Sequence, residues 1–312
     1  MAARVTVPQI GGSSSRVSSG ERATLGVGVG MEPTRRELLA GLSAGALVGC
    51  AGDQATLGRP TAPSLYIGHG SPMLAVDPAR GAAMRAMGED LGEARAILAF
   101  SAHWLGTPLT LGAVEAFPLN YDFTGFPQEL YEVRYPYRGA PGLAQEVAAL
   151  ATTQVGEVYY DELRNFDHGV WTPLVHMVPD GDVPILQVSL PTGLGPEGLF
   201  ALGRALAPLR RSGVVFFCSG NLTHGITGDS ASGAQAHEFD AWAVEAIGAG
   251  DFDALIDAPN KAPAFVLNHP SDEHWLPILV AAGASSAWSE EASYPVEGFE
   301  GENISQRCVR WG

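Results

Sequence analysis

Residues 214–224 read VVFFCSGNLTH, an unbroken apolar run that ends in small polar residues and a histidine. Two other stretches have the same form, LYIGH at residues 65–69 and AILAFSAH at residues 96–103. Apolar runs of this length, bounded by Gly and Ser, are typical of strands buried inside a parallel sheet. Ligands of open α/β sheets bind beyond the carboxyl ends of the strands, so the three runs predict that their histidines gather at one sheet edge.

The gathered histidines indicate a transition-metal site, because imidazole is a preferred ligand of such ions. The three runs contribute His69, His103 and His224. A fourth candidate is His274, which stands at the start of the last expected helix and can point at the same edge. We expect His269, five residues earlier, to lie elsewhere, since residues five apart do not share one helix face.

A further histidine, His168, lies in the motif DHGVW at residues 167–171, directly after a carboxylate and before a glycine. Histidine exchanges protons near neutral pH, so this residue can act as an acid or base on a substrate. A loop histidine that caps a turn explains the motif equally well. We expect His176 and His237 to be structural or solvated.

From residue 64 onward, strand-like runs alternate with helix-like runs, which predicts a single α/β domain with a mainly parallel central sheet flanked by helices. The amphipathic pattern places helices at 78–93, 142–153, 199–209, 235–247 and 275–282, the last capped by Ser271 or Asp272. Further strands are expected at 109–114, 157–160 and 183–190, with an edge strand at 304–309.

Aromatic residues crowd the segment 117–137, which has no helical or strand period and is expected to be a long structured loop. Such loops often cover a binding site. The rings of Tyr121, Phe123 and Phe126 are therefore candidates for contacting a bound substrate. The alternative is a small hydrophobic core beneath the loop.

The composition excludes two classes of partner. The chain has 312 residues and a formal net charge of −16, which argues against binding to nucleic acid or to an anionic membrane surface. Its three cysteines are too few and too scattered for a disulfide framework or a thiolate metal site.

The N-terminal region has the form of an export signal. Residues 1–30 are expected either to be disordered or to be present only because the start codon was assigned too early. Residues 31–50 carry Arg35-Arg36 before a short apolar stretch, which is similar to a twin-arginine signal. The sequence LVGC at residues 47–50 resembles a lipobox, with a lipid anchor at Cys50. We therefore expect an exported protein, periplasmic or anchored to the envelope. If the segment is only an amphipathic helix with a buried cysteine, the protein is cytoplasmic.

Six motifs in order resemble the DOPA-dioxygenase type of class III extradiol ring-opening dioxygenases. The resemblance covers residues 64–312, which would form the dioxygenase domain, with 51–63 as a linker. The motifs are HGSPM at 69–73, SAHW at 101–104, YDFTGFP at 121–127, DHGVW at 167–171, SGNLTH at 219–224 and EHWLP at 273–277.

This resemblance implies that His69, His103 and His274 bind one Fe(II), or Zn(II) where zinc takes the site. It implies that His224 acts as an acid or base and can serve as a fourth ligand, and that His168 contacts the substrate or O2. Other members of the superfamily use two histidines and a carboxylate, whereas this chain has His274 as the third ligand. The implied reaction is the opening of a small catecholic substrate with O2.

Two other functions remain open on the residues alone. A zinc hydrolase would use the same histidines to activate a water molecule. A metal-binding protein without catalysis would also fit. The sequence does not name the catechol or the oligomeric state.

Overall fold

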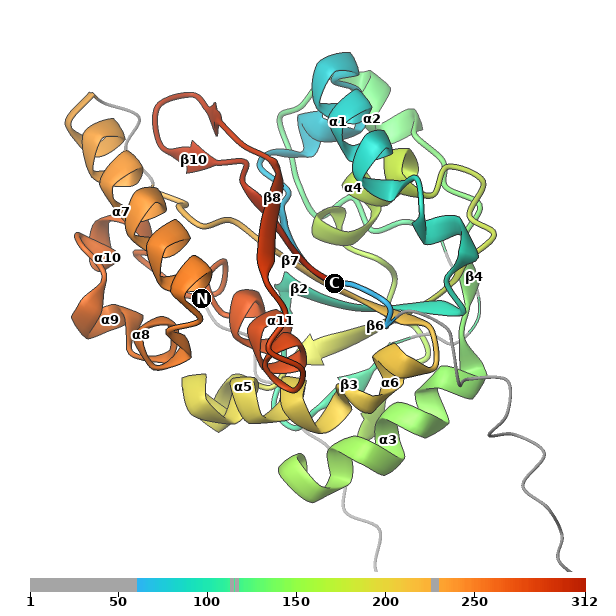
Figure 1. Cartoon of the computed structure of the whole chain (residues 1–312). Coiled ribbons are helices and arrows are strands. Elements are labelled where there is room, and N and C mark those ends of the chain that lie inside the picture. The colour runs from blue at the N-terminus through green and yellow to red at the C-terminus, as the bar shows by residue number, and fades with distance from the viewer. Residues whose placement is uncertain (1–60, 113–114, 116–117, 226–229) are drawn as a thin grey trace, which may run out of the picture. The chain divides into compact units, whose positions relative to one another are not determined.

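The computed structural model describes residues 61–112, 115, 118–225 and 230–312, built around a mixed β-sheet (Figure 1). Strand β7 (Val214–Gly220) pairs in parallel with β1 (Ser64–Gly68) on one side and with β2 (Ala96–Leu105) on the other. The three apolar runs that the sequence predicts as buried strands are therefore adjacent strands of one sheet.

The other strands extend this centre on both sides. The order among the described residues is β5-β3-β6-β2-β7-β1-β11-β8, with β4 beside β6. Antiparallel pairing occurs at β3–β6, β1–β11 and β11–β8, while the other pairs are parallel, which confirms the predicted mainly parallel sheet. These strands are β3 (Thr110–Leu111), β4 (Arg138–Gly139), β5 (Tyr159–Tyr160), β6 (Pro184–Leu190), β8 (Ala292–Val296) and β11 (Cys308–Trp311); β9 (Phe299–Glu300) and β10 (Ile304–Ser305) form a separate pair.

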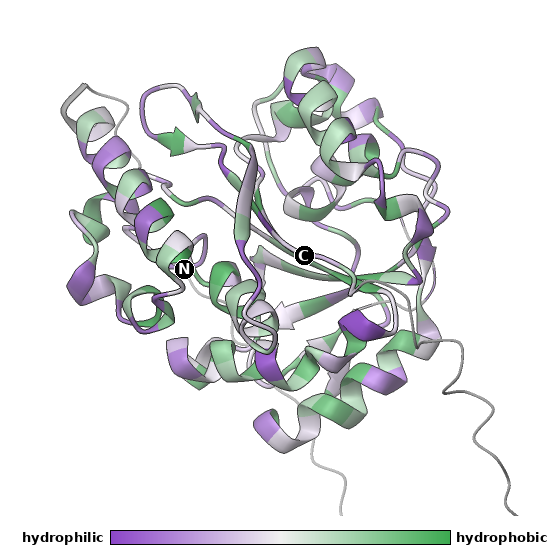
Figure 2. Ribbon diagram, viewed as in Figure 1, coloured by the Kyte–Doolittle hydropathy of each residue, from purple (hydrophilic) through white to green (hydrophobic). Residues whose placement is uncertain are grey.

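Alternating side chains of the central strands feed two hydrophobic cores, because successive residues of a strand point to opposite faces. In β2, Leu98 and Phe100 join one core while Ile97 and Ala99 join the other. The first core is covered by α3 (Pro141–Val155), α5 (Gly195–Leu206), α7 (Ser230–Ala249) and α11 (Pro277–Ser286), and the second by α1 (Pro78–Gly88) and α4 (His168–Met177). The central strands are largely apolar, and hydrophilic residues are spread along the helices around them (Figure 2).

Helices α5 and α11 pack closely through two glycines. A Cβ atom added at Gly203 would lie 2.2 Å from the carbonyl oxygen of Val280, and one added at Gly283 would lie 2.1 Å from that of Phe200. Each helix therefore needs a missing side chain where the other backbone passes. This contact fixes α11, whose preceding turn carries His274.

Two predicted elements are divided or placed differently in the structure. The helix expected at 199–209 is divided into α5 and α6 (Pro208–Arg211), because Pro208 lacks the N–H that a continuous helix needs. The edge strand expected at 304–309 is wrong: β10 pairs with β9 and bridges to His224 through Ile304, and β11 lies inside the sheet between β1 and β8. Its buried residues explain this, since Cys308 and Val309 are fully enclosed.

The ends of the helices also differ from the predictions. The first helix ends at Gly88, and residues 91–93 form a separate 3₁₀ turn. The last helix starts at Pro277 without a side-chain cap, so capping by Ser271 or Asp272 is wrong. The hydroxyl of Ser271 instead donates to Glu273, and the backbone oxygen of Asp272 accepts from the turn that precedes the helix.

Several short helices were not predicted. The aromatic loop contains α2 (Gln128–Glu132), and His168 begins α4 instead of lying in a loop. The region between α7 and the last helix holds α8 (Phe252–Ile256), α9 (Ala258–Lys261) and α10 (Phe265–Asn268).

The predictions for the N-terminal region lie outside the described residues. They comprise the disordered segment 1–30, the export signal 31–50 with its lipid anchor at Cys50, and most of the linker 51–63. Within the described residues, no helix has the length and apolar character needed to cross a membrane.

The α5–α11 contact gives a test of the fold. Replacing Gly203 with Ala should lower the free energy of unfolding by about 1–3 kcal/mol, because the new methyl group collides with the α11 backbone. The measurement is urea denaturation of the purified protein. The matched control is Gly142→Ala in α3, where no atom lies within 4 Å of the added carbon and stability should be equal or slightly higher. Equal stability of the two variants would contradict the close packing.

Candidate metal centre

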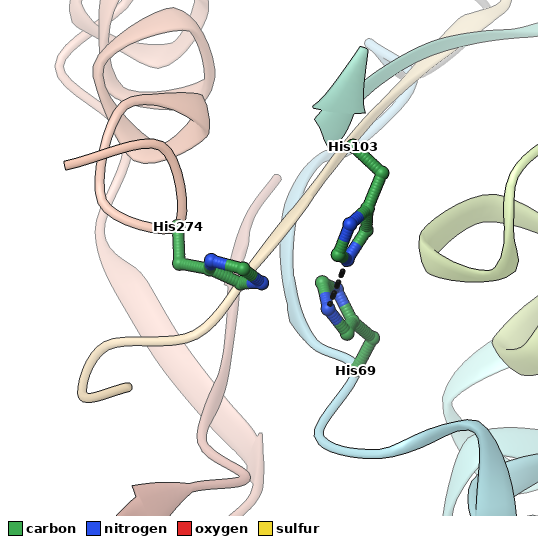
Figure 3. A group of neighbouring side chains, drawn as sticks. All are labelled: His69, His103 and His274. Atoms are coloured by element: carbon green, nitrogen blue, oxygen red, sulfur yellow. Dashed lines mark hydrogen bonds between the residues drawn. The ribbon is translucent and has the colours of Figure 1, made fainter. Parts of the chain in front are cut away.

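Three histidines from distant parts of the chain meet at the carboxyl edge of the sheet. His69 follows β1 directly, His103 lies near the end of β2, and His274 lies in the turn before α11. Their rings point toward a common centre (Figure 3). Because β1, β7 and β2 are parallel neighbours, the first two are delivered to the same edge by the sheet itself. The predicted convergence of these three residues is therefore confirmed.

The distances suit one metal ion. The Nε2 atoms of His69 and His103 lie 3.1 Å apart, and one nitrogen from each of the three histidines falls within 4.8 Å of the others. The ring centroids are 5.0–5.3 Å apart in all three pairs. Two nitrogens bound at about 2.1 Å to one ion at ordinary coordination angles lie about 3.0–3.4 Å apart, which matches the observed separation.

The hydrogen bonds of His69 fix which of its nitrogens is free. The hydroxyl of Ser219 donates its only proton to the carbonyl oxygen of Gly169 at 2.5 Å. It must therefore accept the second bond, a 2.8 Å contact from Nδ1 of His69. With the proton on Nδ1, the lone pair of Nε2 faces His103 and is available to a metal.

His274 is arranged in the same way. Its Nδ1 donates to Oε1 of Glu273 at 3.2 Å, which leaves the lone pair on Nε2. That Nε2 atom is buried and has no hydrogen-bond partner among the described residues. An unpaired buried polar atom is costly, and a metal ion at the centre would satisfy it. The donor set of this structure therefore fits a divalent cation.

Burial keeps the three ligands neutral. Loss of hydration, followed by the charges of the neighbouring histidines, lowers the pKa of His69 well below its usual range. Burial lowers the pKa of His103 to about 4 and that of His274 to about 3. The hydrogen bond from His274 also lowers the pKa of Glu273, to about 2, so this carboxylate remains charged beside the site. Neutral imidazoles are the form that binds metals.

The backbones of His274 and His103 are held by hydrogen bonds with residues of the central strands. The buried hydroxyl of Tyr66 donates to the carbonyl oxygen of His274 at 2.8 Å. A Cβ atom at Gly220 would lie 2.2 Å from that same oxygen, so β7 approaches the turn only because this residue has no side chain. His103 is tied through its N–H to Ser101, whose hydroxyl donates to the fully buried Asp167 at 2.6 Å.

The loop that carries His69 is clamped by the C-terminal part of the chain. Arg80 donates to the carbonyl oxygen of His69 and to Glu300 of β9, both at 2.8 Å. The same carboxylate accepts from the backbone N–H of Ser71 at 2.9 Å. The position of His69 therefore depends on Glu300, which lies 220 positions after Arg80 and 229 positions after Ser71.

His168 lies beside the three ligands without joining them. Its ring centroid is 4.0 Å from that of His103 and 5.5 Å from that of His69. The Oδ1 atom of Asp122 accepts from both the backbone N–H and Nδ1 of His168, each at 3.0 Å. Burial raises the pKa of Asp122, but the bonds and charge of His168 outweigh it and leave the pKa below its usual value.

His224 is close to the centre but outside the group of three donors. Its ring stacks on that of His274 at 3.7 Å with an angle of 4° between the planes. The backbone N–H of His224 donates to Asn268, which fixes the segment that follows β7. The stacking places this histidine beside a ligand, and the fourth-ligand role predicted for it remains a prediction.

The aromatic loop reaches the site through one ring. Phe123 packs edge-on against His168 with centroids 5.7 Å apart. Tyr121 and Phe126 pack on Phe123 at 6.3 and 5.3 Å, and the hydroxyl of Tyr121 donates to the backbone of Val133. These rings also lie against the second hydrophobic core, so the loop has its own packing as well as a contact with the site.

The remaining histidines are structural or exposed, as predicted. His269 donates through Nε2 to the carbonyl oxygen of Leu222 and is enclosed by aromatic rings. His176 is bonded to the backbone of Leu74, and His237 is exposed beside Phe299.

Sequence reasoning did not identify the residues that orient the histidines of the site. Ser219 and Asp122 lie inside quoted motifs, but nothing in the sequence relates them to histidines 150 and 46 positions away. Glu273 directly precedes His274 in the sequence, and a carboxylate next to a candidate histidine is the one sequence signal that could have indicated a supporting residue.

The α/β sheet and the turn before α11 bring three imidazoles to one point, which defines a candidate metal site at the sheet edge. Comparison with known proteins makes this specific. Residues 65–305 match the family described as the catalytic LigB subunit of aromatic ring-opening dioxygenase, and the chain belongs to this family.

Two curated relatives and one solved structure support this family assignment. The chain is 35% identical over 231 residues to a 4,5-DOPA dioxygenase extradiol of Beta vulgaris, a match that covers 71% of this chain and 86% of the relative. It is 34% identical to the protein of the same name from Escherichia coli, with 80% and 94% covered. The crystal structure of an uncharacterized Escherichia coli K12 protein superposes with a TM-score of 0.65 at 29% identity, covering 80% of this chain and all of that one.

These findings make the protein an enzyme, a ring-opening dioxygenase of the extradiol type. Its family is metal-dependent, and the three-histidine site is able to hold the ion.

Glu273 gives a test of the metal centre. Replacing it with Gln removes the charge behind His274 and should weaken the binding of a divalent metal about 10- to 100-fold, as loss of outer partners of metal-bound histidines typically does. His274→Ala should reduce binding further. Affinity is measured by competition with a chelator. The control His237→Gln, at an exposed position, should bind like the wild type, and unchanged affinity in both site variants would contradict this centre.

His269 gives a test of the effect of pH on stability. Burial lowers its pKa from the ordinary 6.5 to about 4, so the unfolded chain takes up this proton first as the pH falls. The free energy of unfolding of the metal-free protein should therefore decrease between pH 6.5 and 4, by about 3 kcal/mol from this residue. Chemical denaturation at several pH values measures it. His269→Gln keeps a donor for Leu222 and should show a shallower pH dependence; the same slope in both proteins would refute the assignment.

Proposed function

We propose that the protein opens the ring of a small catechol with O2, breaking the bond between a hydroxyl-bearing carbon and its neighbour outside the diol. Fe(II) is the proposed ion. The observation that carries the proposal is the set of three imidazoles that bring one nitrogen each within 4.8 Å of the others, two of them oriented by Ser219 and Glu273. The relatives named as 4,5-DOPA dioxygenases support a DOPA-like catechol as the substrate.

The charge of the site suits an ionised catechol. Three neutral ligands would leave the double charge of the ion uncompensated among the atoms that touch it, which favours a substrate that has lost hydroxyl protons. When bound, Fe(II) supplies the Lewis acidity that holds the diol and the one-electron chemistry that O2 requires.

Two histidines are proposed to move protons. With Nδ1 bonded to Asp122, His168 has Nε2 available to accept a proton from a substrate hydroxyl. His224, stacked on His274, is the second candidate for acid or base. Its possible role as a fourth ligand belongs to the same proposal.

The aromatic loop is proposed to contact the ring of the substrate. Phe123 packs against His168, so its ring lies next to the proposed proton acceptor. Tyr121 and Phe126 support Phe123, and together they would exclude water from the reacting ring.

Oxygen consumption tests the function directly. The protein is loaded with Fe(II) under anaerobic conditions and mixed with DOPA, catechol or protocatechuate in buffer containing O2. We expect a yellow product and one O2 consumed per substrate opened, with no uptake by the His69→Ala variant, which lacks a ligand.

The same experiment decides between the alternatives. Hydrolysis of ester or amide substrates by the zinc-loaded protein, without consumption of O2, would support the zinc hydrolase. Absence of turnover with Fe(II), Zn(II) and other divalent ions on all three catechols would contradict the dioxygenase proposal and leave a metal-binding protein.

A further inference from the structure

The carboxylate of Asp122 bonds twice to a single residue on a distant element. Its Oδ1 atom accepts from the backbone N–H of His168, the first residue of α4, and from Nδ1 of the same residue, each at 3.0 Å. The first bond satisfies a free N–H at the start of the helix, and the second fixes the ring. One side chain therefore sets both the position and the orientation of His168.

The second bond also fixes the proton on the imidazole ring. A carboxylate is an acceptor, so the bonded nitrogen must be a donor. In the neutral ring the other nitrogen, Nε2, then carries the lone pair. Among the described residues, this Nε2 atom has no hydrogen-bond partner, and it is not fully buried. It therefore remains accessible to a substrate.

Asp122 also belongs to the aromatic loop. It lies between Tyr121 and Phe123, and Phe123 packs edge-on against the ring that Asp122 holds. Asp122 thus joins the loop to α4 next to the point where Phe123 packs against His168. A shift of the loop would displace Phe123 and His168 together.

We propose that Asp122 is a positioning residue that holds His168 in the tautomer with a free Nε2 and joins the aromatic loop to it. This inference rests on the proposed function. In the step it serves, the O–H bond of a substrate hydroxyl breaks and its proton forms a bond to Nε2, while the electron pair stays on the oxygen. The resulting imidazolium is stabilised by the carboxylate of Asp122 and returns the proton to the product.

A different role for Asp122 would act through the metal ligand His103. Its Oδ2 atom lies 4.0 Å from Nδ1 of His103, too far for a hydrogen bond, whereas both bonds to His168 are 3.0 Å. One donor atom from each of His103, Asp122 and His168 also falls within 4.8 Å of the others, but the carboxylate of this group is already used by His168. The geometry favours His168 as the residue that Asp122 acts on.

Nitrogen NMR of the zinc-loaded, full-length protein tests the tautomer without any need for turnover. In protein with ¹⁵N-labelled histidine at pH 8, the signals of His168 are assigned by their loss in His168→Gln. We expect the proton on Nδ1 and an unprotonated Nε2. A spectrum with a protonated Nε2 in the wild type overturns the proposal, whether or not the protein opens catechols.

Kinetics of the Fe(II)-loaded protein test the functional consequence. Asp122→Ala should lower kcat at least about 10-fold, with a change in KM of less than about 3-fold, because proton transfer is impaired more than substrate binding. In the His168→Ala background, the same substitution should change kcat by less than about 3-fold, since its target is gone. Glu129→Ala, an exposed carboxylate of the same loop, is the matched control and should act like the wild type.

Metal affinity separates the two roles of Asp122. If it acts through His168, Asp122→Ala should bind a divalent ion within about 3-fold of the wild type. A larger loss of affinity, together with an undiminished kinetic effect in the His168→Ala background, would assign Asp122 to His103 and overturn the proposal. If the wild type does not open catechols, the proposed function fails, and the NMR result still decides the tautomer.

Discussion

The parallel pairing of β7 with β1 and with β2 is the constraint on which the site depends. Residues 64–68 pair with 216–220, and residues 96–101 pair with 214–219, so Gly68 lies level with Gly220 and Ser101 lies level with Ser219. This register brings His69 and His103 to one edge of the sheet and places Ser219 between their strands, where its hydroxyl holds Nδ1 of His69. A slip of one residue would turn these side chains to the opposite face.

Burial and hydrogen bonding act together on the ligands. Removal of water makes protonation unfavourable, and the acceptors at Nδ1 decide which nitrogen keeps a lone pair. His69 has a neutral acceptor, the hydroxyl of Ser219, whereas His274 has the charged carboxylate of Glu273. The negative charge that a carboxylate ligand would bring is thus placed one bond further out, behind an imidazole.

The sequence was sufficient for the three central strands and for the convergence of His69, His103 and His274, but not for the residues that support them. Long apolar runs that end in histidine predict both a buried strand and the sheet edge at which the histidine lies, because burial leaves a pattern in the sequence itself. Residues such as Asp122 and Ser219 carry no such pattern, since each acts through one contact with a residue far away in the chain. For the same reason β11 was mistaken for an edge strand: only the tertiary structure shows that β8 lies beyond it. Proline divided the helix at 199–209, a local effect that the sequence did contain.

The clamp on His69 has a consequence for the order in which the protein is assembled. The first ligand follows β1, but the carboxylate that holds its loop is Glu300, and the strand that covers the free side of β1 is β11. A ribosome makes these residues more than two hundred positions later. The nascent chain therefore reaches its final arrangement around His69 only after Glu300 and β11 have emerged, so the centre matures well after its first histidine has been synthesised.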